Sequence, residues 1–107
     1  MPGKGTILVI DDEEAMRDSC CQVLTGEGYR AETAKDGNSG LDKIKHIKPD
    51  LVLVDLKMPG MSGMELLEKI GEIDPDIVSV VITGYATIES AVEAIKRNAY
   101  DFLPKPF

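Results

Sequence analysis

Residues 50–55, DLVLVD, form an unbroken aliphatic run that ends in an acid. Two other segments share this design, because TILVIDD at residues 6–12 ends in two acids and IVSVVIT at residues 77–83 ends in a hydroxyl. Continuous β-branched and aliphatic runs are typical of parallel strands that are buried on both faces. We therefore expect these runs to form the centre of one parallel sheet, with their polar ends along one edge.

The elements expected around these runs alternate between strand and helix. We predict central strands at 6–10, 50–54 and 77–82, and edge strands at 29–34 and 100–103, where polar residues mix with apolar ones. The intervening segments repeat their apolar residues with a helical period. This alternation predicts an α/β fold with right-handed crossovers, a doubly wound five-stranded parallel sheet in the flavodoxin-like order 2-1-3-4-5.

Apolar stripes and breaker residues mark the expected helices. The stripes are Met16, Cys20, Val23 and Leu24 in the first helix, and Ile88, Ala91, Val92, Ile95 and Ala99 in the fourth. Gly26 and Gly28 should close the first helix, Asp36 should open the second, and Pro49 and Pro75 should stop the second and third.

The chain offers no fifth helix, because only residues 104–107 follow the last expected strand. We expect one face of the sheet to expose an apolar patch. We also expect the natural chain to continue, or a partner chain to cover this face.

Composition indicates one domain over residues 1–107, since 43% of the residues are hydrophobic and 29% are charged. No apolar run approaches the roughly 18 residues of a membrane span, and Met1–Gly5 lacks the apolar stretch of a signal peptide, so we expect a cytoplasmic location. The net charge of −7 argues against binding to nucleic acid or an anionic membrane. Cys20 and Cys21 have no ligand-spaced partners and are interpreted as packing thiols.

Three carboxylates should meet at one edge, because Asp11 and Asp12 follow the first expected strand and Asp55 follows the third. Ligands of such sheets bind at the switch point between these two strands. Carboxylates this close repel one another unless a proton or a cation neutralises them. Magnesium fits, because it takes oxygen ligands and typically uses one or two carboxylates. A role as helix cap accounts for one acid, Asp12 being the candidate, and leaves the other unexplained.

Asp55 is the candidate nucleophile. The next helix has its own start at Ser62, in the capping-box pattern Ser62-Gly63-Met64-Glu65, so Asp55 heads a loop with no helix to cap. A carboxylate in this place can attack phosphorus and form an aspartyl phosphate. The Thr83 hydroxyl and the Lys105 ammonium could stabilise the charge of the phosphoryl oxygens. Taken singly, Thr83 could instead bond to the following turn, and Lys105 could be an ordinary surface residue.

The motifs together resemble the receiver domain of two-component response regulators. They are ILVIDDE (7–13), LVLVDLKMPGMSGMELL (51–67), VVITGYAT (80–87) and AYDFLPKPF (99–107), and they span nearly the whole chain. The ending FLPKPF is most similar to receivers of the nitrogen-regulation type, which control transcription activators.

The resemblance implies a phosphoacceptor and a metal site. Asp55 would receive its phosphoryl group from a phosphohistidine on a sensor histidine kinase. Asp11 and Asp12 would be the acidic pair, and Asp12, Asp55 and the backbone carbonyl of Lys57 would ligate Mg²⁺. The domain would be regulatory and would promote only its own phosphorylation and dephosphorylation.

The resemblance also implies a conformational switch. Lys105, ahead of an expected cis bond to Pro106, would contact the phosphoryl oxygens. Thr83 and Phe102 would be the switch pair: Thr83 swings toward the phosphoryl group, Phe102 enters the vacated space, and the surface of the fourth helix and fifth strand changes. That surface would control an output domain outside this chain, expected to be transcriptional, and could support a phosphorylation-dependent homodimer.

Two features of the chain limit what the resemblance implies, and other functions compete with it, including a binding module that has lost its phosphorylation, which is poorly supported because all five site residues are present. The missing final helix leaves dimerisation open, and Lys57 and Tyr85 occupy positions that tune the lifetime of the aspartyl phosphate in this family. A magnesium-dependent phosphohydrolase with an aspartyl nucleophile is the main alternative, but such enzymes typically carry D-x-D and cap insertions. A flavin carrier is disfavoured because the acids after the first strand would repel a phosphate.

Overall fold

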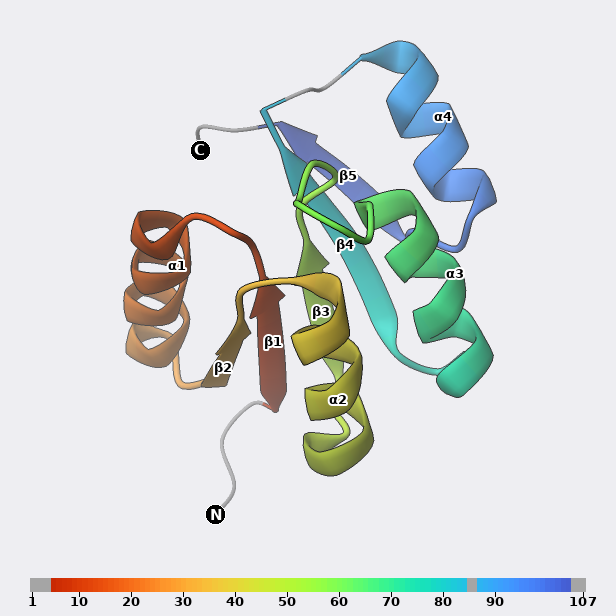
Figure 1. Cartoon of the computed structure of the whole chain (residues 1–107). Helices are drawn as coiled ribbons and strands as arrows, with labels where there is room; N and C mark the ends of the chain where they lie inside the picture. Colours follow the sequence, from red (N-terminus) through yellow and green to blue (C-terminus); the bar gives the residue numbers. More distant parts are fainter. Residues whose placement is uncertain (1–4, 85–86, 105–107) are drawn as a thin grey trace.

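The computed structural model describes residues 5–84 and 87–104, and these form a single parallel sheet with helices on both faces (Figure 1). The strands are β1 (Thr6–Ile10), β2 (Arg30–Ala34), β3 (Leu51–Val54), β4 (Val78–Thr83) and β5 (Asp101–Pro104). The helices are α1 (Glu14–Gly26), α2 (Gly37–Ile47), α3 (Gly63–Ile73) and α4 (Ile88–Lys96). The sheet order β2-β1-β3-β4-β5 confirms the predicted topology.

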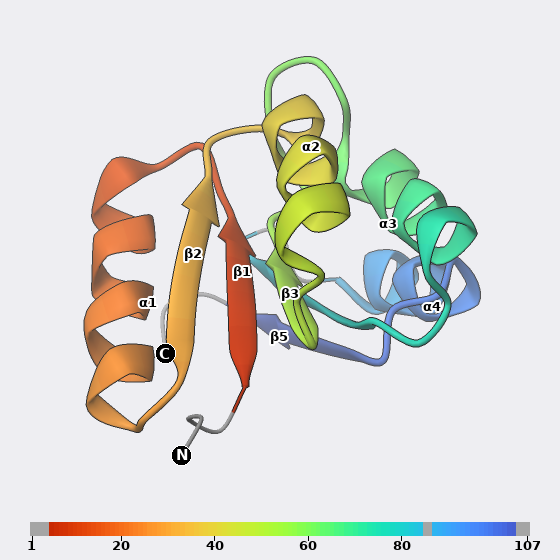
Figure 2. The ribbon, with the colours of Figure 1, turned by 90° about the horizontal axis from the view of Figure 1, so that it is seen from below.

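The helices divide unequally between the two faces of the sheet. Helices α2, α3 and α4 cover one face, and α1 covers the other beside β1 and β2 (Figures 1 and 2). The hydrophobic core lies under the three helices, where strand residues such as Leu8 and Val52 meet helix residues such as Ile44, Leu66 and Ile70. None of the helices in the described part of the chain is long and apolar enough to cross a membrane.

The face that α1 leaves open is less exposed than predicted. Strand residues alternate between faces, so this face carries the neighbours of the core residues. Val80 and Ile82 are only 8% and 5% exposed, and Leu53 is half-buried. Among the described strand residues, Leu103 of β5 is the large hydrophobic one that fits the expectation, at 42% exposed.

Most predicted helix ends are confirmed. The Asp36 carboxylate accepts a hydrogen bond from the Ser39 amide at 2.8 Å, and this bond holds the pKa of Asp36 below its usual value. Helix α2 ends at Ile47, and its C-cap residue Lys48 takes a left-handed conformation with φ of 47° just before Pro49. Helix α3 ends at Ile73, and its C-cap residue Asp74 directly precedes Pro75.

Two predicted apolar stripes are partly wrong. In α4, Ala94 is fully buried, whereas Val92 and Ile95 are 48% and 50% exposed. In α1, Cys20 is buried as expected, but Val23 is 65% exposed. Each apolar stripe is wider than the helix face that packs against the sheet. The apolar residues beyond that face are exposed, because no described element packs against them.

Candidate metal centre

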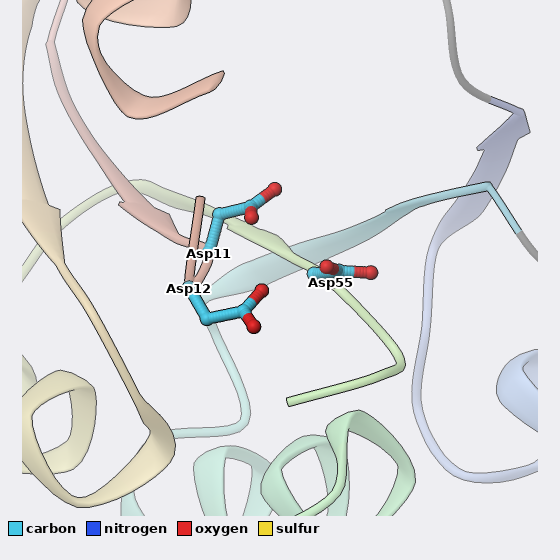
Figure 3. A group of neighbouring side chains, drawn as sticks. All are labelled: Asp11, Asp12 and Asp55. Atoms are coloured by element: carbon cyan, nitrogen blue, oxygen red, sulfur yellow. The ribbon is translucent and has the colours of Figure 1, made fainter. Parts of the chain in front are cut away.

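The acid cluster is built by the pairing of β1 with β3. Ile10 lies opposite Val54 in the parallel register, and the Asp55 amide donates to the Ile10 carbonyl at 3.1 Å. The residues that follow these two strands therefore lie side by side. Asp11, Asp12 and Asp55 each direct a carboxylate into the same space (Figure 3). One oxygen from each lies within 4.8 Å of the others, so the predicted convergence of three acids is confirmed.

Asp11 is the most firmly held acid of the cluster. It is 3% exposed, and its amide donates to the Ala34 carbonyl at 3.1 Å. Its carboxylate accepts from the Glu13 amide at 2.9 Å, and its carbonyl accepts from Arg17 Nη1 at 2.6 Å. The interpretation of Asp12 as the capping acid is wrong, because Glu13 occupies the N-cap position of α1 and no side chain caps that helix end. Arg17 was not predicted, since nothing in the spacing alone shows that its guanidinium reaches back to Asp11.

Asp55 heads the loop between β3 and α3, as predicted. Its side chain is 6% exposed and accepts a long hydrogen bond from the Lys57 amide at 3.4 Å. Helix α3 starts independently, because the Ser62 hydroxyl accepts from the Glu65 amide at 3.3 Å. Asp55 therefore has no capping role.

An open pocket lies over the cluster. It is lined by Asp12, Glu13, Asp55, Lys57, Met58 and Pro59. Asp12 is exposed to this pocket and Asp55 lines it as a buried residue, whereas Asp11 is buried and does not line the pocket. Sequence reasoning had not assigned Glu13, Met58 or Pro59 to the site, although each is next to or near a predicted site residue along the chain.

Thr83 and Phe102 occupy neighbouring strands on the helix-covered face. Thr83 ends β4 and is fully buried. Phe102 lies opposite Val81 in the β4–β5 register and packs, partly buried, against the hydrophobic core. Because Val81 and Thr83 alternate onto the same face, Phe102 lies beside the strand that carries Thr83. Lys105 and Pro106 lie outside the described residues.

The cluster of three carboxylates suits a hard divalent cation. Three carboxylates so close together repel one another, and burial of two of them increases that repulsion because water screens it less. A cation with oxygen ligands removes the repulsion, and the open pocket leaves room for water or a further anionic ligand. The residues present therefore fit a metal ion bound by oxygen atoms.

Comparisons with known proteins agree with this picture. The family model described as "Response regulator receiver domain" matches residues 7–107. The nitrogen assimilation regulatory protein NtrX of Azorhizobium caulinodans is 42% identical over 103 residues, which cover 94% of this chain and 23% of that protein. The transcriptional regulator NtrC of Klebsiella pneumoniae is 36% identical over 104 residues, covering 97% of this chain and 22% of that protein.

The solved structure of a receiver domain is also similar to this chain. The receiver domain of NtrX from Brucella abortus superposes with a TM-score of 0.89 at 43% identity, covering 94% of this chain and 86% of that one. The chain thus spans less than a quarter of the NtrX and NtrC relatives named above and most of an isolated receiver domain.

Proposed function

The chain belongs to the response regulator receiver domains, and from this we propose that it accepts a phosphoryl group on Asp55 with the help of Mg²⁺. The observation that carries the proposal is the cluster of Asp11, Asp12 and Asp55, which each place an oxygen within 4.8 Å of the others, and two of which, Asp12 and Asp55, line an open pocket. The phosphoryl donor would be a phosphohistidine of a sensor histidine kinase.

The transfer exchanges one bond to phosphorus for another. A carboxylate oxygen of Asp55 attacks the phosphorus, the new O–P bond forms, and the N–P bond to the histidine of the kinase breaks. The electron pair of that bond stays on the imidazole nitrogen, which can then take up a proton. Burial of Asp55 restricts its side chain to few orientations, so the attacking oxygen is held facing the pocket.

Asp11, Asp12, Asp55 and the backbone carbonyl of Lys57 would hold the metal. Bound Mg²⁺ would neutralise the carboxylates and the phosphoryl oxygens during transfer. Asp11 supports this role because bonds from Glu13 and Arg17 fix it in place. The Thr83 hydroxyl, and Lys105 by the family resemblance, would contact the phosphoryl oxygens.

Phosphorylation would be passed on through α4 and β5. The new charge on Asp55 attracts the Thr83 hydroxyl, and Phe102 moves into the space that Thr83 leaves. Two observations support this path. Strands β4 and β5 are adjacent in the sheet. Val92 and Ile95 of α4, and Tyr100 just before β5, are exposed. The surface would act on an output domain outside this chain that regulates transcription, in the cytoplasm, and could also pair two phosphorylated domains.

The proposal is tested by incubation with acetyl phosphate and Mg²⁺, followed by intact mass measurement. We expect one added phosphoryl group, which is lost on chelation and in Asp55→Asn. Asp18→Asn, a change at an exposed acid of α1, should label as the wild type does. Labelling that persists in Asp55→Asn would refute the assignment. Sustained turnover of a generic phosphomonoester would favour the phosphohydrolase instead.

A further inference from the structure

The first residue of α3 lies directly against the backbone of the proposed phosphoacceptor. Gly63 is buried, and a Cβ atom built on it would lie 2.6 Å from the Cα of Leu56 and closer still to the carbonyl oxygen of Asp55. Real Cβ atoms do not approach other atoms this closely. Both obstructing atoms belong to the backbone and cannot rotate away, so any side chain here must displace either the acceptor segment or the helix.

Helix α3 is the less movable of the two. Leu66, Leu67 and Ile70 are each fully buried in the core, and a shift of the helix would disturb all three. Asp55 and Leu56 are buried too, but the loop that continues from them is less constrained, because Lys57, Pro59 and Gly60 are exposed. A side chain at residue 63 would therefore act mainly on the backbone of Asp55 and Leu56.

A hydrogen bond joins the same two segments. The Gly63 amide donates to the Leu56 carbonyl at 2.9 Å, so the loop is closed where α3 begins. This bond and the close approach fix the backbone on either side of the Asp55–Leu56 peptide. The Lys57 carbonyl, proposed as a metal ligand, lies one residue beyond it.

We propose that Gly63 is a positioning residue for phosphoryl transfer, because its lack of a side chain lets the rigid start of α3 support the Asp55–Leu56 peptide. The inference rests on the proposed function. It adds that the position of Asp55 depends on a backbone contact with the start of α3, in which no polar side chain takes part.

Another glycine of the same helix provides a matched control. A Cβ at Gly71 would lie 2.7 Å from Asn98 Nδ2, the end of a side chain that can move aside. Gly71→Ala thus perturbs the packing of α3 far from the acid cluster. Gly26→Ala, at the end of α1, meets nothing within 4 Å and controls for the change of residue type.

The experiment compares the three alanine variants with the wild type, using acetyl phosphate at several Mg²⁺ concentrations. Circular dichroism first establishes a temperature at which each variant is folded. We expect Gly63→Ala to lose about 100-fold in rate at saturating Mg²⁺, the effect of a displacement of roughly 1 Å in an oriented reaction. Calorimetry should show weaker Mg²⁺ binding as well. Gly71→Ala should keep the wild-type rate and Mg²⁺ affinity, because Asn98 can move aside.

A wild-type rate in Gly63→Ala, or an equal loss of rate in Gly71→Ala, would overturn the positioning role and leave the proposed function intact. A wild-type chain that does not label at all would refute the proposed function itself. For a Gly63→Ala variant that does not fold, amide hydrogen exchange of the wild type decides. Mg²⁺ should slow exchange at Gly63 more than at Gly71, because a bound ligand suppresses local opening of the segment that it holds. Equal slowing at both amides would contradict the proposal.

Discussion

Helices α3 and α4 lie side by side on the same face of the sheet, yet they are held in different ways. Helix α3 buries Leu66, Leu67 and Ile70 completely. Among the side chains described in α4, Ala94 is buried, whereas Val92 and Ile95 are about half exposed. Similar amphipathic patterns therefore produce one helix that buries large side chains and another in which the fully buried side chain, among those described, is the small Ala94.

This difference matches the proposed roles of the two helices. Helix α3 supports the acceptor loop, where displacement would damage the chemistry. Helix α4 belongs to the surface that should change upon phosphorylation, and its modest burial makes a shift less costly. The ion pair from Arg97 to Glu68, at 2.8 Å, links the two helices, but both side chains are exposed and the pair contributes little.

The largest expected effect comes from removing a core side chain of α3. Leu67→Ala should lower the free energy of unfolding by about 2–5 kcal/mol, because it loses buried apolar surface and leaves a cavity. Urea denaturation followed by circular dichroism measures the change. A loss below about 1 kcal/mol would mean that α3 is not the firmly packed helix of the comparison.

Metal binding should stabilise the site end of the sheet by a similar amount. At a Mg²⁺ concentration 100 times its dissociation constant, the free energy of unfolding should rise by about 2.7 kcal/mol. Asp12→Asn should abolish most of this gain and raise stability without metal, since it relieves repulsion within the cluster. Melting curves with and without Mg²⁺ test both effects. An Asp12→Asn variant that gains as much from Mg²⁺ as the wild type would remove Asp12 from the ligand set.

The N-terminal caps of α3 and α4 offer a further test of the difference in packing between these two helices. The Thr87 hydroxyl accepts from the Ser90 amide at 3.0 Å, and the Thr87 amide donates to the Ser90 hydroxyl at 3.1 Å. Thr87→Ala should cost about 1 kcal/mol and speed amide exchange throughout α4, because the large side chains described in that helix, Val92 and Ile95, are about half exposed. Ser62→Ala should affect only the first turn of α3. If Ser62→Ala speeds amide exchange throughout α3, as Thr87→Ala should in α4, the two helices do not differ in packing.

A smaller, pH-dependent effect is expected in α2, the third helix of this face. The bond from the Ser39 amide lowers the pKa of Asp36, so ionised Asp36 stabilises the folded state above its unfolded pKa of about 3.9. This contribution is lost as pH falls through the lower, folded pKa. Asp36→Ala should therefore melt earlier than the wild type at pH 7, and the gap should close in strong acid. A gap that is independent of pH would exclude the ionised cap.

The smallest effect should come from the exposed side of α4. Ile95→Ala should change the free energy of unfolding by no more than about 0.5 kcal/mol, because the side chain is half exposed and alanine favours the helix. The same urea denaturation measures it. A loss comparable to that of Leu67→Ala would show that α4 is buried as firmly as α3.

The strand pattern allowed the sheet and most of its site to be predicted. Runs such as residues 50–54 must be central because both of their faces are apolar, and their ends must share an edge because the strands are parallel. That reasoning predicts that Asp11, Asp12 and Asp55 lie together. It failed for Val23 and Ile95, because a helical period shows that an apolar stripe exists but not which part of it meets a neighbour.

The sequence alone determined the order of the strands and the meeting of three acids, since both follow from local periodicity and from the geometry of parallel crossovers. The tertiary structure decided the rest. It showed that Asp11 binds the amide ahead of α1, and that Gly63 lies against the Asp55–Leu56 peptide. Such contacts depend on how neighbouring backbones and side chains settle in three dimensions, which no periodic pattern along the chain records.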